Sequence, residues 1–304
     1  MRSDDVFVVA RHDITLPRKG GTIKIMPFGD VHYDTKLCDQ DRFHAWLDRC
    51  KRDDDEYTRY ISAGDLFDFC STSERQKLAM ARLHNTTAET LDDMQQAKVY
   101  KMIERLWFMR GRLLGMIQGN HYWTFNTDPD GTATEQTSVE RMCQKLECPW
   151  LGSIAVIHIS VNFEGCGTRS QLQIVIAHGK SGGKLIGTSI NQVEDMFRIF
   201  PGADIYLMGH NHKKGGLTST RLFVDCGANG TPTVRQHKQV FSRTGSFKRG
   251  YVAGQGSYEA GRLYQATDLG VVRVEADFER VRKVKHPGTD QFHERMVKSV
   301  HVWS

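Results

Sequence analysis

Short apolar runs recur along the chain, and each ends in glycine or alanine followed by polar residues. The runs with their polar ends are TIKIMPFGD, YTRYISAGD, RLLGMIQGN, LQIVIAHG and ADIYLMGH. Runs of this length with glycine beside them are typical of buried strands rather than helices. The pattern therefore predicts five strands, each with a polar side chain close to its carboxyl end.

Segments with helical periodicity lie between these runs. The stretch 42–53 has the spacing i, i+3, i+4, i+7 in its apolar residues, which are Phe43, Trp46, Leu47 and Cys50. A longer helical region is expected over 71–113, opening with the capping-box sequence STSE. Segments 134–147 and 189–200 also have a helical pattern. Alternating strands and helices indicate an α/β protein.

The second half of the chain is richer in strand patterns. Two β-type runs surround the turn EGCGTR between Ile154 and Ile176, which predicts a hairpin. Further strands are expected at 220–227 and 269–284. We therefore predict an α/β fold of two packed mixed β-sheets flanked by helices. Residues 1–304 would form a single domain, with 71–113 as a helical insertion and 235–304 as a basic C-terminal extension that completes the fold.

Composition excludes several classes of protein. Apolar residues make up 39% of the 304 residues and charged residues 25%, which is ordinary for a globular protein. No apolar run approaches 18 residues, so we expect no membrane span and no contact with a membrane, and the first apolar stretch is too short for a signal peptide. The seven cysteines are scattered without a CxxC motif, which indicates neither a disulfide framework nor a zinc ribbon. A cytoplasmic location is the expectation.

Positive charge is concentrated near the C-terminus. From Arg235 onward there are 13 Lys and Arg against 7 Asp and Glu, whereas the preceding residues carry 28 against 29. Such an excess suits a polyanionic partner such as nucleic acid, and the alternative is a solvated basic surface. Segment 229–258 mixes basic and aromatic residues with little periodicity. It is expected to be an irregular surface segment. The alternative is a binding site for single-stranded nucleic acid.

Metal-capable side chains follow all five predicted strands. The strand ends carry, in order, GDVH, GDLFD, GNH, AHG and GHNH. Open α/β sheets collect their ligand sites at the carboxyl ends of strands. One such motif alone is weak, but an ordered set of five indicates a metal centre.

In this order the motifs resemble those of the calcineurin-like metallophosphoesterase superfamily. That pattern is Asp-x-His, Gly-Asp-x-x-Asp, Gly-Asn-His-Asp/Glu, a lone His, and Gly-His-x-His. The resemblance extends from Ile25 to His212, about two thirds of the chain, and it suggests a bacterial or phage member. It implies a metallophosphoesterase-type β-sandwich flanked by helices. Tyr122 departs from the pattern, because the family usually has Asp or Glu there, so the hydrogen bonding around His121 is in doubt.

The resemblance assigns two metal ions to seven side chains. The first ion would be held by Asp30, His32, Asp65 and His212. The second would be held by Asp65, Asn120, His178 and His210, with Asp65 bridging the two. Mixed imidazole and carboxylate ligands suit Mn, Fe, Zn or Ni, whereas Ca²⁺ and Mg²⁺ prefer oxygen. We expect two divalent transition-metal ions, with Mn preferred.

The resemblance also assigns acid–base chemistry to a neighbouring pair. His121 would protonate the leaving oxygen or steady the phosphoryl group, and Asp68 would hold its imidazole and raise its pKa. Two lysines just past His178, Lys180 and Lys184, are candidates for contacts with substrate phosphates.

The implied activity is that of a metal-dependent phosphoesterase, which hydrolyses a phosphate ester with a hydroxide held by the two metals. The basic C-terminal part favours a phosphodiester of nucleic acid or nucleotide, so DNA, RNA or a nucleotide is the expected partner. One alternative is a phosphomonoesterase, either a nucleotidase or a phosphatase. Another is a non-catalytic metal-binding scaffold, although every ligand position is filled here. The helical region 71–113 could cap the site or form a homodimer, or else pack on the sheet.

Overall fold

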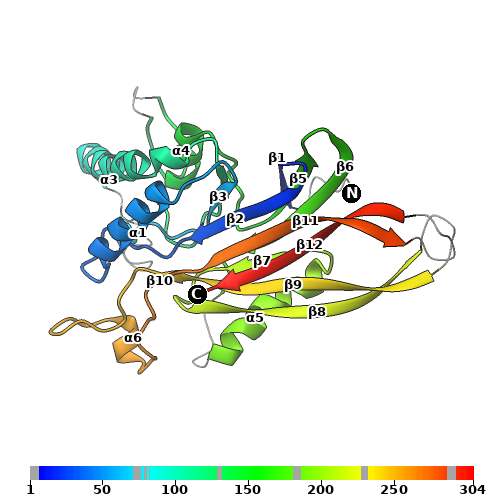
Figure 1. Cartoon of the computed structure of the whole chain (residues 1–304). Coiled ribbons are helices and arrows are strands. Elements are labelled where there is room, and N and C mark those ends of the chain that lie inside the picture. Colours follow the sequence, from blue (N-terminus) through cyan, green and yellow to red (C-terminus); the bar gives the residue numbers. More distant parts are fainter. Residues whose placement is uncertain are drawn as a thin grey trace.

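The chain folds into two mixed sheets with helices on their outer faces (Figure 1). The computed structural model describes residues 7–70, 77–78, 81, 83–128, 132–180, 186–226, 232–285 and 292–304. The predicted capping box at 71–74 therefore lies outside the described residues. No helix in the described ranges is both long and apolar enough to cross a membrane.

One sheet has five strands in the order β12-β11-β2-β3-β4. Its three parallel strands are β2 (Gly20–Phe28), β3 (Thr58–Ser62) and β4 (Leu113–Met116). The hairpin of β11 (Arg273–Lys285) and β12 (Phe292–Trp303) extends it, with β11 antiparallel to β2. The C-terminal strands thus complete a sheet that the N-terminal half begins.

The other sheet has seven strands, six of them in the order β1-β5-β6-β7-β9-β10, with β8 pairing with β9. They are β1 (Val8–Leu16), β5 (Ile154–Phe163), β6 (Cys166–Ala177), β7 (Ile205–Met208), β8 (Lys214–Cys226), β9 (Pro232–Ser246) and β10 (Gly270–Val271). Strands β5 and β6 form the predicted hairpin, and β6, β7 and β9 run parallel.

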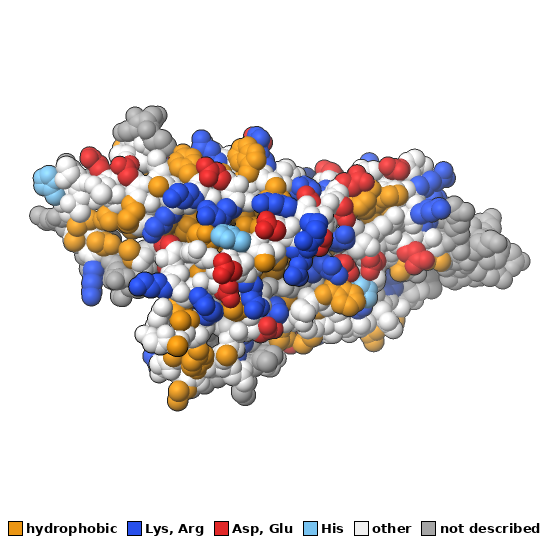
Figure 2. All heavy atoms as spheres, turned by 60° about the vertical axis from the view of Figure 1, so that its left-hand side comes forward, with side chains coloured by type: hydrophobic (Ala, Val, Ile, Leu, Met, Phe, Trp, Pro, Cys, Tyr) orange, Lys and Arg blue, Asp and Glu red, His pale blue; other side chains and the backbone are white. Residues whose placement is uncertain are grey.

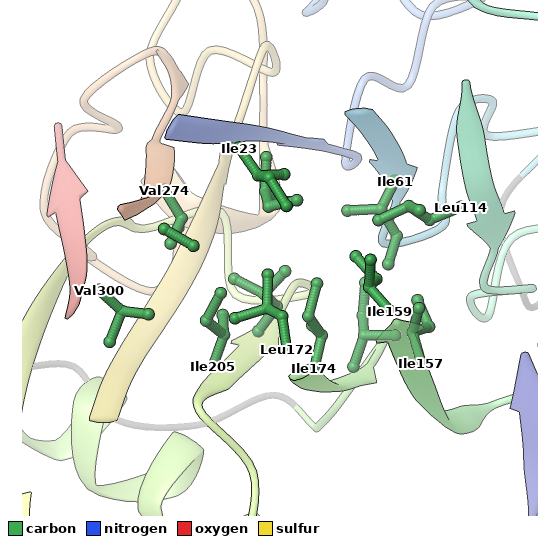
Figure 3. Packing of buried hydrophobic residues seen from close by; sticks show 14 of the residues in the cluster. Ile23, Ile61, Leu114, Ile157, Ile159, Leu172, Ile174, Ile205, Val274 and Val300 are labelled. Atoms are coloured by element: carbon green, nitrogen blue, oxygen red, sulfur yellow. The ribbon is translucent and has the colours of Figure 1, made fainter. Parts of the chain in front are cut away.

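The facing sides of the two sheets make the central core (Figure 3). Ile23 and Ile61 of the five-stranded sheet meet Ile159 and Ile174 of the other, and all four side chains are fully buried. Each buried aliphatic side chain of this size contributes about 1.5–3 kcal/mol to folding. The predicted fold class, two packed mixed sheets flanked by helices, is confirmed.

Helices cover the outer faces. On the five-stranded sheet lie α1 (Gln40–Arg52), α3 (Asn85–Leu106), followed by the short η2 (Trp107–Met109), and α4 (Ser138–Leu146). Helix α5 (Ile186–Ile199) covers β7 and β9 of the other sheet, and α6 (Tyr258–Gly261) is a single turn. The four predicted apolar positions of α1 are all buried. Buried residues of α3, among them Met102 and Leu106, pack in the same cluster as α1, α4 and the sheet.

The pattern of the sequence missed three strands. Strands β1 and β12 were not predicted, and most of the first half of segment 229–258, expected to be irregular, is the long strand β9. Polar side chains of β9 such as Ser242, Arg243 and Thr244 are buried, which hides the usual alternation of polar and apolar residues. The expected irregular segment is therefore corrected to a strand followed by a loop.

Candidate metal centre

The five motifs meet at one edge of the molecule. Three of them follow the neighbouring parallel strands β2, β3 and β4, and two follow the neighbouring strands β6 and β7 of the other sheet. Backbone hydrogen bonds join the first two loops, since the N–H of Asp30 donates to Gly64 O (2.9 Å) and that of Val31 to Asp65 O (2.9 Å). The carboxyl ends of strands from both sheets thus bring the predicted residues together.

A first group consists of Asp30, His32 and His212, whose possible ligand atoms all lie within 4.8 Å of one another. The Nε2 atoms of the two histidines are 3.1 Å apart, and Nε2 of His212 is 3.9 Å from Asp30 Oδ1. Asp30 and His32 are buried, and His212 is half-buried. These are three of the four side chains that the resemblance assigns to the first ion.

A second group consists of Asp65, His178 and His210, again within 4.8 Å. His178 Nε2 lies 3.0 Å from Asp65 Oδ2 and 2.9 Å from His210 Nδ1. The side-chain oxygen of Asn120 is 2.8 Å from both of these imidazole nitrogens. All four side chains assigned to the second ion therefore converge, while the bridging role of Asp65 stays a prediction.

The hydrogen bonds of this site fit a cation. His178 Nδ1 donates to Ala63 O (2.8 Å) and His32 Nδ1 to Asp68 Oδ1 (2.9 Å), so both rings direct Nε2 into the cluster. Two ring nitrogens 3.1 Å apart cannot both donate to each other. Asp30 Oδ1 is buried without a hydrogen-bond partner among the described residues. Buried lone pairs that face one another are costly unless a cation lies between them.

The charges of the two groups shift one another's pKa values. Burial raises the pKa of Asp30, and the nearby histidines do not offset it. Burial lowers the pKa of His32 to about 4 and that of His210 to about 4, so both rings are neutral and able to bind a metal. Burial would also lower the pKa of His178, but the charge of Asp65 and its hydrogen bond raise that pKa to about 9. A cation bound here would compete with that proton.

His121 lies beside the cluster and contacts Asp68, as expected. Its Nδ1 is 2.9 Å from Asp68 Oδ1, and the same carboxylate oxygen also accepts from His32. Burial opposes protonation of His121, but the hydrogen bond to Asp68 and the charge of Asp65 outweigh it and raise its pKa. Asp68 thus connects the candidate acid to a candidate metal ligand, a link that the sequence did not predict.

Five of the seven candidate ligands have left-handed backbone conformations. Their φ angles are 46° for Asp30, 48° for His32, 51° for Asp65, 72° for His210 and 57° for His212. Such angles are uncommon for residues other than glycine and cost of order 1–3 kcal/mol each. Gly119, at φ 74°, permits the closest approach, since a Cβ there would lie 2.2 Å from Asp65 Oδ1. The loops therefore hold these side chains in backbone conformations that lower the stability of the fold.

Supporting residues were missed by the sequence analysis. Asp34 accepts hydrogen bonds from the backbone N–H groups of Asp68 (2.6 Å) and Phe69 (3.2 Å) and pairs with Lys98 of α3 (3.0 Å). Buried Arg243 donates to Gly209 O (2.7 Å), just before His210. Glu259 of α6 lies 3.3 Å from Nδ1 of His212. Asp34 lies in the same short loop as His32, which is a signal that could have been used; Arg243 and Glu259 have no comparable motif.

Other expectations have mixed outcomes. Lys180 pairs with Asp195 (3.4 Å) on the surface, and Lys184 lies outside the described residues. Tyr122 packs against the apolar cluster of α1, α3 and α4, which explains an aromatic residue at that position. The basic C-terminal part uses some of its charge internally, because Lys298 pairs with Asp204 and Arg249 donates to Cys38 O. Figure 2 shows Lys and Arg side chains interspersed with Asp and Glu on one face.

Comparisons of the sequence found no match, and a comparison of the structure found a distant one. No protein-family model matches it, and no curated protein sequence matches it. Among solved structures, the chain matches Vps29 from Chaetomium thermophilum with 10% sequence identity and a TM-score of 0.32, over 93% of this chain and 97% of that one. A likeness this distant carries no argument about activity, so the geometry of the site must support any functional interpretation.

Proposed function

We propose that the protein is a metal-dependent phosphoesterase that uses two divalent transition-metal ions, Mn²⁺ being the first choice. One observation carries the proposal. Two groups of imidazole and carboxylate ligands, Asp30–His32–His212 and Asp65–His178–His210, lie side by side at the carboxyl ends of strands from both sheets. Mixed nitrogen and oxygen donors of this kind select borderline transition metals.

The side chains of both groups would hold the two ions and fix their positions. Asp30, His32 and His212 would hold one ion, and Asn120, His178 and His210 the other, with Asp65 shared between them. Bound divalent ions supply Lewis acidity and ionise water near neutral pH, which suits attack on phosphorus. Asn120 contributes a neutral oxygen, so the ligand set leaves net positive charge to attract a phosphate ester.

His121 is proposed as the proton donor to the leaving oxygen. Its raised pKa keeps the ring protonated further toward neutral pH, and its Nδ1 hydrogen bond to Asp68 fixes the orientation of the ring. General acids of this kind contribute about 10²–10⁴-fold to rate. Replacing His121 by Ala should therefore slow esters with poor leaving groups most, while the metal content stays unchanged.

The proposed substrate is a phosphodiester of nucleic acid or nucleotide. The net charge of +5 and the excess of Lys and Arg after residue 234 support a polyanionic substrate. A nuclease or phosphodiesterase is therefore preferred over a phosphomonoesterase.

A substrate panel tests the proposal. The purified protein, loaded in turn with Mn²⁺, Fe²⁺, Zn²⁺ or Ni²⁺, is assayed on bis-(p-nitrophenyl) phosphate, p-nitrophenyl phosphate, and single-stranded and duplex DNA. The expected result is faster hydrolysis of the diester, with metal content measured on the same samples. The variant His84→Ala, at an exposed histidine that belongs to none of the candidate metal-binding groups, serves as the control. Bound metal with no turnover of any ester would identify a binding scaffold instead, and preference for the monoester would identify a phosphatase.

A further inference from the structure

We propose that Glu259, in the segment between β9 and β10, is a positioning residue of the metal centre that fixes the tautomer and orientation of His212. The inference rests on the proposed metal centre and extends it to a part of the chain that follows every recognisable motif. Residues 247–269 leave the seven-stranded sheet after β9 and return to it at β10, and Phe247 at their start packs into the apolar cluster of α1, α3 and α4.

The segment starts and ends at one pair of residues. Strand β9 ends at Ser246 and β10 begins at Gly270, and these two residues pair with each other. The pairing would be satisfied by a tight turn, yet the chain makes a longer excursion that carries α6 (Figure 1, orange). Ser246 Oγ donates to Asp30 O (2.7 Å), and so does the N–H of Phe247 (3.2 Å). The excursion is therefore attached directly to the loop that carries the first candidate ligands.

The excursion places a buried carboxylate against His212. Glu259 is 8% exposed, and its Oε1 lies 3.3 Å from Nδ1 of His212. Its other oxygen, Oε2, is buried and has no hydrogen-bond partner within the described ranges. A buried carboxylate is costly unless it is paired. The contact with His212 pairs this carboxylate, and the charge of Lys248 adds a weaker attraction.

Glu259 is held firmly in that position. The hydroxyl of Ser257 accepts from the N–H of Ala260 (3.0 Å) and donates to Gly250 O, which closes the turn of α6. The N–H of Tyr264 donates to Glu259 O (3.0 Å). A Cβ at Gly250 would lie 3.3 Å from that of Glu259, so the start of the segment and α6 are closely packed.

The contact repeats at His212 an arrangement found at two other inward-facing rings, whereas His210 faces the cluster through Nδ1. His32 and His178 direct Nε2 into the cluster and donate Nδ1–H to an oxygen, Asp68 Oδ1 and Ala63 O respectively. His212 also directs Nε2 inward, toward His32 and Asp30, and Glu259 provides the oxygen for its Nδ1–H. A carboxylate in this place selects the tautomer and raises the basicity of the inward nitrogen.

Two measurements on the same variants test the inference. Glu259→Ala removes the acceptor, Glu259→Gln keeps its size and a neutral acceptor, and Glu279→Gln changes an exposed carboxylate elsewhere on β11. Ring-nitrogen chemical shifts of ¹⁵N-labelled His212 report the tautomer without any metal, and calorimetric titration with Mn²⁺ reports affinity. Loss of an outer-shell carboxylate is expected to weaken metal binding about 10–100-fold.

The expected result is a single Nδ1–H tautomer of His212 in the wild type and in Glu279→Gln, and its loss in Glu259→Ala together with weaker Mn²⁺ binding. Glu259→Gln should lie between the two. An unchanged tautomer in a folded Glu259→Ala or Glu259→Gln protein would overturn the inference. If the wild type hydrolyses no phosphate ester, the proposed function fails, and the chemical shifts still decide the role of Glu259.

Discussion

Two buried aspartates, Asp204 and Asp30, lie at the beginning of one strand and just past the end of another, and their hydrogen-bond partners differ. Asp204 precedes β7, and its carboxylate accepts from the N–H of Gln173 (2.8 Å), from His237 Nε2 (2.8 Å) and from Lys298. Asp30 follows β2; one of its oxygens accepts from the N–H of His210 (2.7 Å) and the other is buried without a hydrogen-bond partner in the described part of the chain. The carboxylate of Asp204 therefore has partners that compensate its charge, whereas that of Asp30 has an oxygen left without one among the described residues.

Their pKa values move in opposite directions for this reason. Burial opposes ionisation of Asp204, but hydrogen bonds from His237 and Lys298 outweigh it and lower its pKa. Burial raises the pKa of Asp30 because its neighbours compensate too little. The comparison shows how a structural ion cluster differs from a candidate binding site. In the first, each charged group has a partner within the protein. In the second, a carboxylate oxygen has no partner in the described part of the chain and, with the imidazole nitrogens beside it, could bind a ligand.

The largest expected effect is a loss of activity on substitution in the candidate metal centre, with no such loss on substitution in the Asp204 cluster. Replacing Asp65 by Asn keeps the left-handed backbone but removes the shared charge of the centre, so both metal content and diester hydrolysis should fall, the latter about 10³-fold. Metal analysis and the bis-(p-nitrophenyl) phosphate assay measure these quantities. Asp204→Asn is the matched control and should retain metal. Full turnover in Asp65→Asn would refute the assignment of the site.

The second effect separates them by stability. Asp204→Ala leaves Lys298 and His237 without their shared acceptor, which should lower the free energy of unfolding by about 3 kcal/mol. Urea denaturation at pH 7 measures it, with Asp48→Ala, an exposed ion-pair residue, as the control. Because folding lowers the pKa of Asp204, this stabilisation is complete above the usual carboxyl pKa of about 3.9 and is lost as the pH falls below it. An unchanged midpoint would contradict a structural role.

A third effect concerns protons released on metal binding. His178, with its pKa of about 9, holds a proton that a metal ion must displace. Mn²⁺ affinity should therefore rise roughly tenfold per pH unit between pH 6 and 8, for one proton released. Calorimetry in buffers of different ionisation enthalpy measures the released protons directly. Affinity independent of pH would show that His178 is already neutral or does not bind the ion.

The smallest expected effect has the opposite sign to that at Asp204. Asp30→Asn removes a buried, poorly compensated charge while its oxygen can still accept from the N–H of His210. The free energy of unfolding should rise by about 0.5–2 kcal/mol at pH 7 in the presence of a chelator. Thermal denaturation checks the change, and Asp48→Asn, at an exposed aspartate of α1 that belongs to neither cluster, is the control. Destabilisation would mean that Asp30 is a structural residue like Asp204.

The strand ends were predictable because they are local. An apolar run, a glycine and a polar residue follow each other directly, so the five motifs and the helix α1 could be read from neighbouring positions. Their convergence follows from parallel strands, whose carboxyl ends meet at one edge. Which residues could form the site was therefore visible in the sequence, and their distances were not.

The missed parts depend on partners far along the chain. Strand β9 has buried polar residues because Ser246 bonds to Asp30 O and Arg243 to Gly209 O, so its pattern reflects the loops of the site rather than the core. Glu259 and Asp204 gain their importance from His212 and Lys298, which adjoin neither of them in sequence. Periodicity carries no information about such pairs.

The left-handed loops also bear on how such a site is lost over time. Asparagine tolerates this conformation, and its codons are one base away from those of both aspartate and histidine. A single base change can therefore replace any of these five candidate ligands by asparagine without a change of backbone conformation. At Asp30 this replacement should even stabilise the protein. Few base changes would thus be needed for the protein to lose the candidate metal site and keep its fold.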